Sequence, residues 1–295
     1  MSLKRIIPVV LVKDGLLVRS QSFKHFQAIG DPIPTIKRLS DWNADEIILN
    51  NISTSINMDS RREDKYHNIG ESSFNDLILA VSDFCRCPLT AGGGIRTLQH
   101  IDNLFESGAD KVIINTCIFN NPSVVTTASK KYGQQAITAS IDIKLCGESI
   151  SVWTDRGSTD TEMNLYDSIK LARDLGAGEI LISSIDNDGT TRGYSNYILS
   201  ALSNFNIDFP VIVNSGATIA KHFQTGLECK NVSAVAASNI FYFTELSYVN
   251  IKKDLISSGI KDIREPSIDS PYIQREPSYR QDKINLLLRK SDPNL

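Results

Sequence analysis

The sequence lacks three features that would point to membranes or nucleic acids. It has no apolar run of 18 residues, whereas a helix needs about 20 such residues to cross a bilayer. No apolar segment followed by a cleavage site comes after Met1, as a secretory signal would require. The net charge is −3, and no long basic stretch offers a surface for nucleic acid. We therefore expect a cytoplasmic protein without a nucleic-acid or membrane partner.

Cysteine and histidine are also scarce and scattered. Of the five cysteines, only Cys85 and Cys87 lie close together in the sequence. A CxC pair alone is a weak indication of zinc, so ordinary reduced thiols are the favoured interpretation and a zinc site is the alternative. The four histidines are dispersed. We expect no metal site and no cofactor.

What is present is an ordinary globular composition with a regular alternation. The 295 residues are 41% hydrophobic and 22% charged, typical of a folded domain with a normal core. Short apolar runs alternate with segments long enough for a helix, which is typical of βα units around a parallel sheet. Strands are predicted at residues 6–12, 46–50, 88–91, 111–114, 136–141, 179–183, 210–213 and 233–236. Helices are predicted at 31–42, 73–84, 98–107 and 164–175.

The sequence also repeats itself after half its length. DEIILNNIS at residues 45–53 is similar to GEILISSID at 178–186, residues 10–13 correspond to 141–144, and 91–94 correspond to 214–217. A twofold repeat of four βα units favours a closed barrel over an open sheet. We predict a single (β/α)8 TIM barrel over residues 1–263 with a polar insertion loop at 57–71. Residues 264–295 form a polar C-terminal extension, with a short helix possible at 283–290.

The active site of such a barrel lies where the strands end. Glycines that follow a strand and precede a helix let backbone N–H groups approach a phosphate, although they also simply make tight turns. Glycine-rich or small polar residues follow the strands of both halves, which together favour a ligand with a phosphate at each end. In the first half these candidates are Gly92, Gly93, Gly94, Asn115 and Thr116, and in the second half Asp188, Gly189, Thr190, Ser215, Gly216, Ala237 and Ser238.

Eight ordered stretches resemble the cyclase subunit family of imidazole glycerol phosphate synthase. They are KRIIP at residues 4–8, KDG at 13–15, GDP at 30–32, GGGI at 92–95, GADKV at 108–112, INT at 114–116, GAGEIL at 176–181 and SIDNDGT at 184–190. The resemblance runs from Lys4 to about Phe243. It implies a barrel that receives ammonia from a glutaminase partner and binds a phosphorylated ribonucleotide. Lys13 and Arg19 in the first loop are further candidates for substrate binding.

The catalytic residues that the resemblance implies are incomplete. In the family, one aspartate from each half-barrel acts as general base or general acid. Asp142 matches the second of them, whereas Leu11 stands at the position of the first. Loss of a positioned acid–base group usually costs about 10²–10⁴-fold in rate. Asn51 also replaces an acidic residue, and Asn214-Ser215 replaces a Ser-Gly pair. Asp142 is therefore either catalytic or a structural carboxylate.

The opposite face of the barrel retains every charged residue that the resemblance implies there. In the family, an arginine, a lysine and two glutamates form a gate through which ammonia enters, and an aspartate contacts the glutaminase. Arg5, Lys111, Glu46 and Glu179 match the gate, and Asp110 matches the contact. The alternative is that these charges merely satisfy one another at the bottom of the barrel.

Three hypotheses about function follow. The leading one is a barrel that docks a glutaminase and passes ammonia to a separate amidotransferase, which forms an acetamidino group on a sugar. A branch of the family associated with surface polysaccharides is similar, because it too has a leucine at the position of Leu11, in a stretch like residues 7–13. The second is an authentic cyclase of histidine biosynthesis in which Lys13, Asp14 or Arg19 replaces the missing base. The third is a non-catalytic subunit that only activates its glutaminase.

Overall fold

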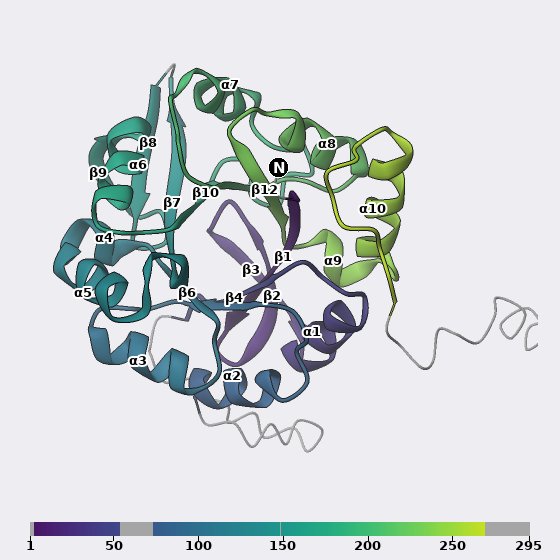
Figure 1. Cartoon of the computed structure of the whole chain (residues 1–295), viewed down its shortest axis with the longest axis horizontal. Coiled ribbons are helices and arrows are strands. Elements are labelled where there is room, and N and C mark those ends of the chain that lie inside the picture. The colour runs from purple at the N-terminus through teal and green to yellow at the C-terminus, as the bar shows by residue number, and fades with distance from the viewer. Residues whose placement is uncertain (1–2, 54–72, 148, 269–295) are drawn as a thin grey trace, which may run out of the picture.

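Eight parallel strands pair side by side in a closed ring (Figure 1). The structure is a computed structural model that describes residues 3–53, 73–147 and 149–268. The ring is closed by pairing of the fifth and sixth barrel strands, β7 and β10. This confirms the predicted (β/α)8 barrel, and all eight predicted strands are present. Their bounds are β1 (Arg5–Lys13), β4 (Ile47–Asn51), β5 (Leu89–Gly92), β6 (Lys111–Ile114), β7 (Ile137–Cys146), β10 (Glu179–Ser184), β11 (Val211–Asn214) and β12 (Val232–Ala237).

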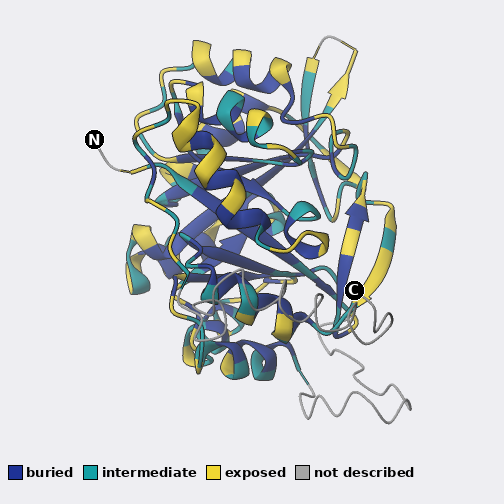
Figure 2. Ribbon diagram, turned by 90° about the vertical axis from the view of Figure 1, so that its right-hand side faces the viewer, coloured by how far each residue is buried: buried dark blue, intermediate teal, exposed yellow. Residues whose placement is uncertain are grey.

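Helices surround this ring, and they turn their exposed residues away from the strands (Figure 2). The four helices predicted from the sequence are α1 (Pro32–Asp41), α2 (Phe74–Ser82), α3 (Leu98–Glu106) and α6 (Leu165–Asp174). The other helical segments are α4 (Thr116–Asn120), α5 (Pro122–Tyr132), η1 (Gln134–Ala136), α7 (Asn196–Asn204), α8 (Ala220–Glu228), α9 (Ile240–Phe243) and α10 (Ser247–Ser257).

Polar side chains fix where the four predicted helices begin. The side chains of Asp31, Ser73, Thr97 and Asn164 each accept a hydrogen bond from a backbone N–H of the first turn. Such N-caps satisfy donors that have no partner within the helix, and each stabilises the helix by about 1 kcal/mol. The caps set the points at which the chain leaves the loops that follow the strands and returns down the outside of the barrel.

Two antiparallel hairpins that the sequence did not predict extend the barrel. β2 (Leu16–Gln21) and β3 (His25–Gly30) follow β1, and β8 (Ser149–Thr154) and β9 (Thr159–Asn164) follow β7. Each hairpin follows the first strand of a half-barrel, β1 or β7. The hairpins are therefore related by the same twofold repeat as the strands. Both lie at the end of the barrel where the parallel strands finish.

The barrel separates two apolar clusters. The larger one fills the space between the strands and the helices. The smaller one lies among inward-facing side chains of the ring: Ile7, Val9, Ile48, Ile113, Leu181, Ile212, Ala234 and Ala236, with Leu11 packed against them. Branched apolar side chains in the interior are usual for this fold. The interior cluster lies between the two polar ends of the barrel.

The start of the predicted C-terminal extension packs under the barrel. Arg264 Nε lies 3.0 Å from Asp45 Oδ1, and the fully buried Lys252 Nζ lies 2.7 Å from the same oxygen. The predicted insertion at residues 57–71 and the short helix at 283–290 lie outside the described residues. In the described ranges, none of the helices has both the length and the apolar character that a membrane span requires.

Candidate functional site

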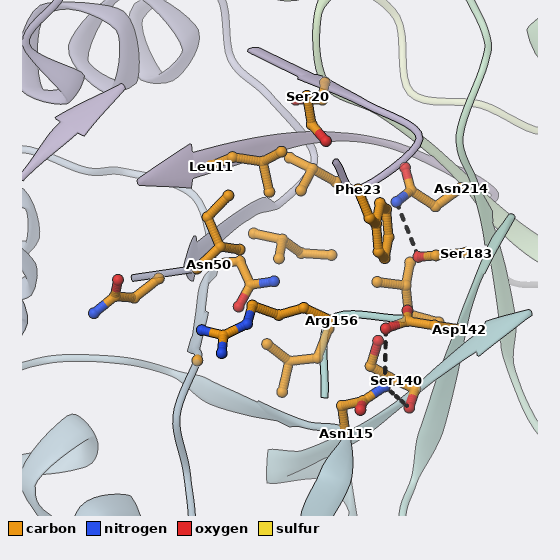
Figure 3. Close-up of a pocket in the computed structure, with 18 of the residues that line it drawn as sticks. Leu11, Ser20, Phe23, Asn50, Asn115, Ser140, Asp142, Arg156, Ser183 and Asn214 are labelled. Carbon is orange, nitrogen blue, oxygen red and sulfur yellow. Dashed lines mark hydrogen bonds between the residues drawn. The ribbon is translucent and has the colours of Figure 1, made fainter. Parts of the chain in front are cut away.

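A cavity of about 930 Å³ opens at the end of the barrel where the strands finish (Figure 3). Both hairpins contribute to its wall, through Ser20 and Phe26 on one side and Asp155 and Arg156 on the other. The floor is the upper surface of the interior apolar cluster, with Val9, Ile48, Ile113 and Leu181. A cavity of this size, part apolar and ringed by polar groups, is typical of a small-molecule site.

Asp142 is the most strongly perturbed carboxyl group in this cavity. It lies on β7, is only 8% exposed, and accepts a hydrogen bond from Asn115 Nδ2 at 3.1 Å. Burial, reinforced by the nearby charge of Asp188, raises the pKa of Asp142 to about 7. A carboxyl group that titrates near neutrality is able to donate or accept a proton at physiological pH.

Leu11 lies across the cavity from Asp142 (Figure 3). It is on β1, where register pairs it with Asn50 of β4, and its backbone N–H donates to the Tyr242 hydroxyl at 3.2 Å. The twofold repeat therefore places an aliphatic side chain where a carboxylate would face Asp142. Of the two carboxylates that the resemblance implies, the cavity therefore has Asp142, and the residue opposite it, Leu11, cannot act as an acid or base.

Most of the predicted phosphate-binding residues of the first half are brought together. Gly93, Gly94, Asn115 and Thr116 line the cavity, whereas Gly92 does not. Gly93 has a φ of +114°, and a Cβ atom there would lie 1.9 Å from the Asn51 carbonyl oxygen. Only glycine allows the loop to pass so close to β4, which brings the loop and the start of α3 to the cavity edge.

The second half contributes a matching set. Asp188, Gly189, Ser215, Gly216 and Ser238 line the cavity. Four further candidates from the sequence, two of the second half and two of the first loop, lie outside the lining. Thr190 and Ala237 lie beside it in sequence, Arg19 is exposed, and the Lys13 ammonium stacks over the Phe26 ring with 4.9 Å to its centroid.

The lining residues that sequence reasoning missed include Ser20, Phe23, Asn50, Arg156 and Ser183. Three of them, Ser20, Phe23 and Arg156, belong to the two hairpins, which were not predicted from the sequence. Arg156 Nη1 donates to the Ser53 carbonyl oxygen at 3.1 Å, so it extends from one side of the mouth to the other. Asn50 and Ser183 hold equivalent positions in the two halves, and the repeat was the signal that could have identified them.

A ring of four charged side chains occupies the opposite end of the barrel. Arg5 Nη1 lies 2.5 Å from Glu46 Oε2, and another nitrogen of Arg5 bonds Glu179. Lys111 Nζ lies 3.0 Å from Glu46 and 3.4 Å from Glu179. Each carboxylate therefore bridges both cations. Hydrogen bonds and the charges of both glutamates outweigh burial and raise the pKa of Arg5.

The four side chains of this ring are the predicted gate, and they converge as expected from their positions at the strand starts. Glu46 and Glu179 are buried, while the side chains of Arg5 and Lys111 keep about a fifth to a quarter of their surface exposed. Thr90 Oγ1 also donates to Glu46 at 2.6 Å. The ring closes the bottom of the barrel, directly below the interior apolar cluster.

The predicted partner contact and the cysteine pair lie near this end. Asp110 is exposed, and its Oδ2 accepts from the Leu89 backbone N–H at 2.8 Å, which is a structural role. The thiols of Cys85 and Cys87 are free, with their sulfur atoms 3.7 Å apart. Within residues 3–53, 73–147 and 149–268, no three cysteine, histidine or acidic residues gather as metal ligands would.

Comparison with known proteins finds one family and many similar relatives. A family model described as histidine biosynthesis protein matches residues 5–247. The imidazole glycerol phosphate synthase subunit HisF of Endomicrobium trichonymphae is 36% identical over 257 residues, which cover 87% of this chain and 94% of the relative. The protein of the same name from Campylobacter concisus is 34% identical over 261 residues, covering 88% and 97%. That from Chloroherpeton thalassium is 35% identical over 257 residues, covering 87% and 97%.

Proposed function

Because this chain belongs to the histidine biosynthesis protein family, we propose that it docks a glutaminase and conducts ammonia through its barrel. Its relatives are named as subunits of a synthase, so a protein partner is part of their activity. The proposal includes Asp110 at the docking face and Arg5, Glu46, Lys111 and Glu179 as the gate. The ammonia then serves a separate amidotransferase, which forms an acetamidino group on a sugar of a surface polysaccharide.

One observation carries this proposal. The complete four-residue ion ring is present at one end of the barrel, while Leu11 stands opposite Asp142 at the other end. Buried charges are costly unless each is paired, and here the pairing is complete. The chain thus keeps the entrance that ammonia would use and lacks half of the acid–base pair that would use ammonia inside the cavity.

The cavity would still hold a phosphorylated ligand in this proposal. Gly93 and Gly94 approach it with their backbone, and Asn115 and Thr116 add polar side chains beside them. Backbone N–H groups of a glycine loop and of a helix start are suited to a phosphate. This phosphate site lies in the first half of the barrel, near Arg96, which also lines the cavity.

Docking is tested by mixing the purified chain with a glutaminase from the same organism. We expect glutamine hydrolysis to increase about tenfold on complex formation, a usual size for coupling between sites. Asp110→Asn should weaken the complex, because it removes a charge while keeping an oxygen that accepts from Leu89 N–H. Asp160→Asn is the matched control, since Asp160 is an exposed aspartate on β9 at the other end of the barrel.

Transfer is tested by adding the sugar amidotransferase and glutamine with a ¹⁵N amide, in the presence of unlabelled ammonium. The expected product carries mainly ¹⁵N, because ammonia that travels through the barrel does not mix with the solvent. Lys111→Met should lower the ¹⁵N fraction while Arg5 still pairs with both glutamates. Equal labelling of product and solvent ammonium would contradict the channel.

A second candidate, an authentic cyclase of histidine biosynthesis, is favoured by a specific observation. Asp142 keeps its position and has a pKa of about 7, as a general acid or base requires. Growth of a cyclase-deficient strain on this chain without added histidine would support this candidate. Failure to grow at normal expression levels would count against it.

A further inference from the structure

The loop between α2 and β5 holds two thiols in direct contact. Cys85 and Cys87 are both free, and their sulfur atoms lie 3.7 Å apart. The other three cysteines are separate: Cys117 and Cys229 are buried in the larger apolar cluster, and Cys146 is exposed at the end of β7. All five cysteines lie within the described residues. The close pair is therefore a specific feature of this loop.

The two thiols of the pair differ in how easily a small molecule reaches them. Cys85 is partly exposed, whereas Cys87 is 9% exposed and belongs to the larger apolar cluster. A hydrogen bond from Cys87 lowers the pKa of the Cys85 thiol, although partial burial opposes the shift. Because the thiolate is the form that attacks a disulfide, Cys85 is the thiol that reacts first with a reagent from solvent. The Cys87 sulfur is then already beside the sulfur that has reacted.

The surroundings of the pair suit a disulfide better than a zinc ion. A structural zinc takes four ligands, and over the described part of the chain no three cysteine, histidine or acidic side chains form such a group. A disulfide needs only the two sulfur atoms, which must move from 3.7 Å to about 2.05 Å. A ring closed across a single intervening residue is strained, and strained disulfides are the readily reduced, regulatory ones.

We propose that Cys85 and Cys87 form a reversible redox site, which a small-molecule disulfide converts from two thiols to one disulfide. The Cys85 thiolate attacks one sulfur of the reagent, whose S–S bond breaks and releases a thiolate. That thiolate takes the proton of Cys87, and the Cys87 sulfur attacks the Cys85 sulfur and displaces the second half of the reagent, which takes a proton from water. Two protein thiols and one reagent disulfide thus become one protein disulfide and two reagent thiols.

Oxidation is expected to affect the docking face, because the pair leads directly into β5. Pro88 follows Cys87, and its carbonyl oxygen accepts from the Ile47 N–H at 2.9 Å. Leu89 N–H donates to Asp110 Oδ2, and Asp110 N–H donates to the Leu89 carbonyl oxygen, each at 2.8 Å. A disulfide that pulls on Cys87 therefore displaces the start of the strand that holds Asp110. This step rests on the proposed function, in which Asp110 meets a glutaminase.

The redox site is tested on the full chain with the substitution Cys146→Ser, which removes the exposed single thiol. The protein is incubated with equal concentrations of reduced and oxidised glutathione, and the remaining thiols are blocked with N-ethylmaleimide. Trypsin cuts after Arg86, between the two cysteines, so the peptides that contain Cys85 and Cys87 separate only when the thiols were reduced. We expect the two peptides to remain joined, with a mass about 2 Da below the sum of the two thiol peptides.

Single substitutions distinguish a redox pair from two thiols that merely pack together. In Cys87→Ser, nothing displaces glutathione from Cys85, so the adduct there should exceed that of the parent protein by about tenfold or more. In Cys85→Ser, the buried Cys87 should take up little glutathione. A parent protein that keeps as much glutathione on Cys85 as Cys87→Ser does would overturn the proposal, and so would one in which both thiols stay unmodified.

The effect on docking is measured with the reduced and oxidised forms of the same protein, each freed of glutathione before it is mixed with the glutaminase. Stimulation of glutamine hydrolysis should be about fivefold weaker after oxidation and should return when dithiothreitol is added. Equal stimulation by the two forms would overturn the coupling to Asp110. A reduced form that fails to stimulate the glutaminase would contradict the proposed function, while the peptide test would still decide the redox site.

Discussion

Given high ammonium and the ribonucleotide substrate of its relatives, the purified chain is expected to form imidazole glycerol phosphate about 10²–10⁴-fold more slowly than a relative assayed beside it. The reason is the pair of residues across the cavity, because Leu11 can neither take nor give a proton to a substrate bound between it and Asp142. Ammonium at high concentration removes any need for a glutaminase, so the assay measures the cavity alone.

Leu11→Asp tests whether the missing carboxylate is the cause. We expect it to recover part of the lost rate, because β1 already places residue 11 opposite Asp142. Leu11→Asn is the matched control, since it adds polarity of the same shape without an ionisable group, and it should recover nothing. In the Leu11→Asp background, Asp142→Asn should abolish the gain. Turnover of the unmodified chain near that of the relative would show that Leu11 has been bypassed.

The barrel strands were predictable because they are buried on both faces. Segments such as 47–49 and 211–213 read as uninterrupted aliphatic runs, which a parallel strand inside a barrel requires. The hairpins were not predictable in this way. β3 is exposed at four of its six positions, so its sequence carries no apolar alternation. Its fold-back depends on pairing with β2 and on contacts with Asp188, which lies far away in the sequence.

The site divides in the same way: residues on or just after barrel strands were predicted, and residues on the hairpins were not. Gly93 and Ser215 follow strands directly and Asp142 lies on β7, so strand spacing alone brought them to one edge. Ser20 and Arg156 reach the cavity through hairpins. Hydrogen bonds between the loops, such as that from Asn239 Nδ2 to the Ser20 carbonyl oxygen, depend on side-chain geometry that no spacing rule specifies.

Asp142→Asn should stabilise the folded chain at neutral and higher pH. Burial raises the pKa of Asp142 from its usual 3.8 to about 7, so the folded chain holds this proton more tightly than the unfolded chain does. The free energy of unfolding therefore falls as the pH rises from about 4 to about 7. The separation between 3.8 and about 7 corresponds to at most about 4 kcal/mol at pH 8.

The variant keeps an oxygen that accepts from Asn115 Nδ2 and cannot ionise. Urea unfolding at pH 4 and at pH 8 measures the effect: the variant and the unmodified chain should coincide at pH 4, and the variant should be more stable at pH 8. Asp160→Asn, at an exposed aspartate, should show no such divergence. A difference that does not change with pH would contradict a raised pKa of Asp142. A divergence of the expected sign would mean that the chain keeps a carboxylate which lowers its stability, as a carboxylate serving a ligand would.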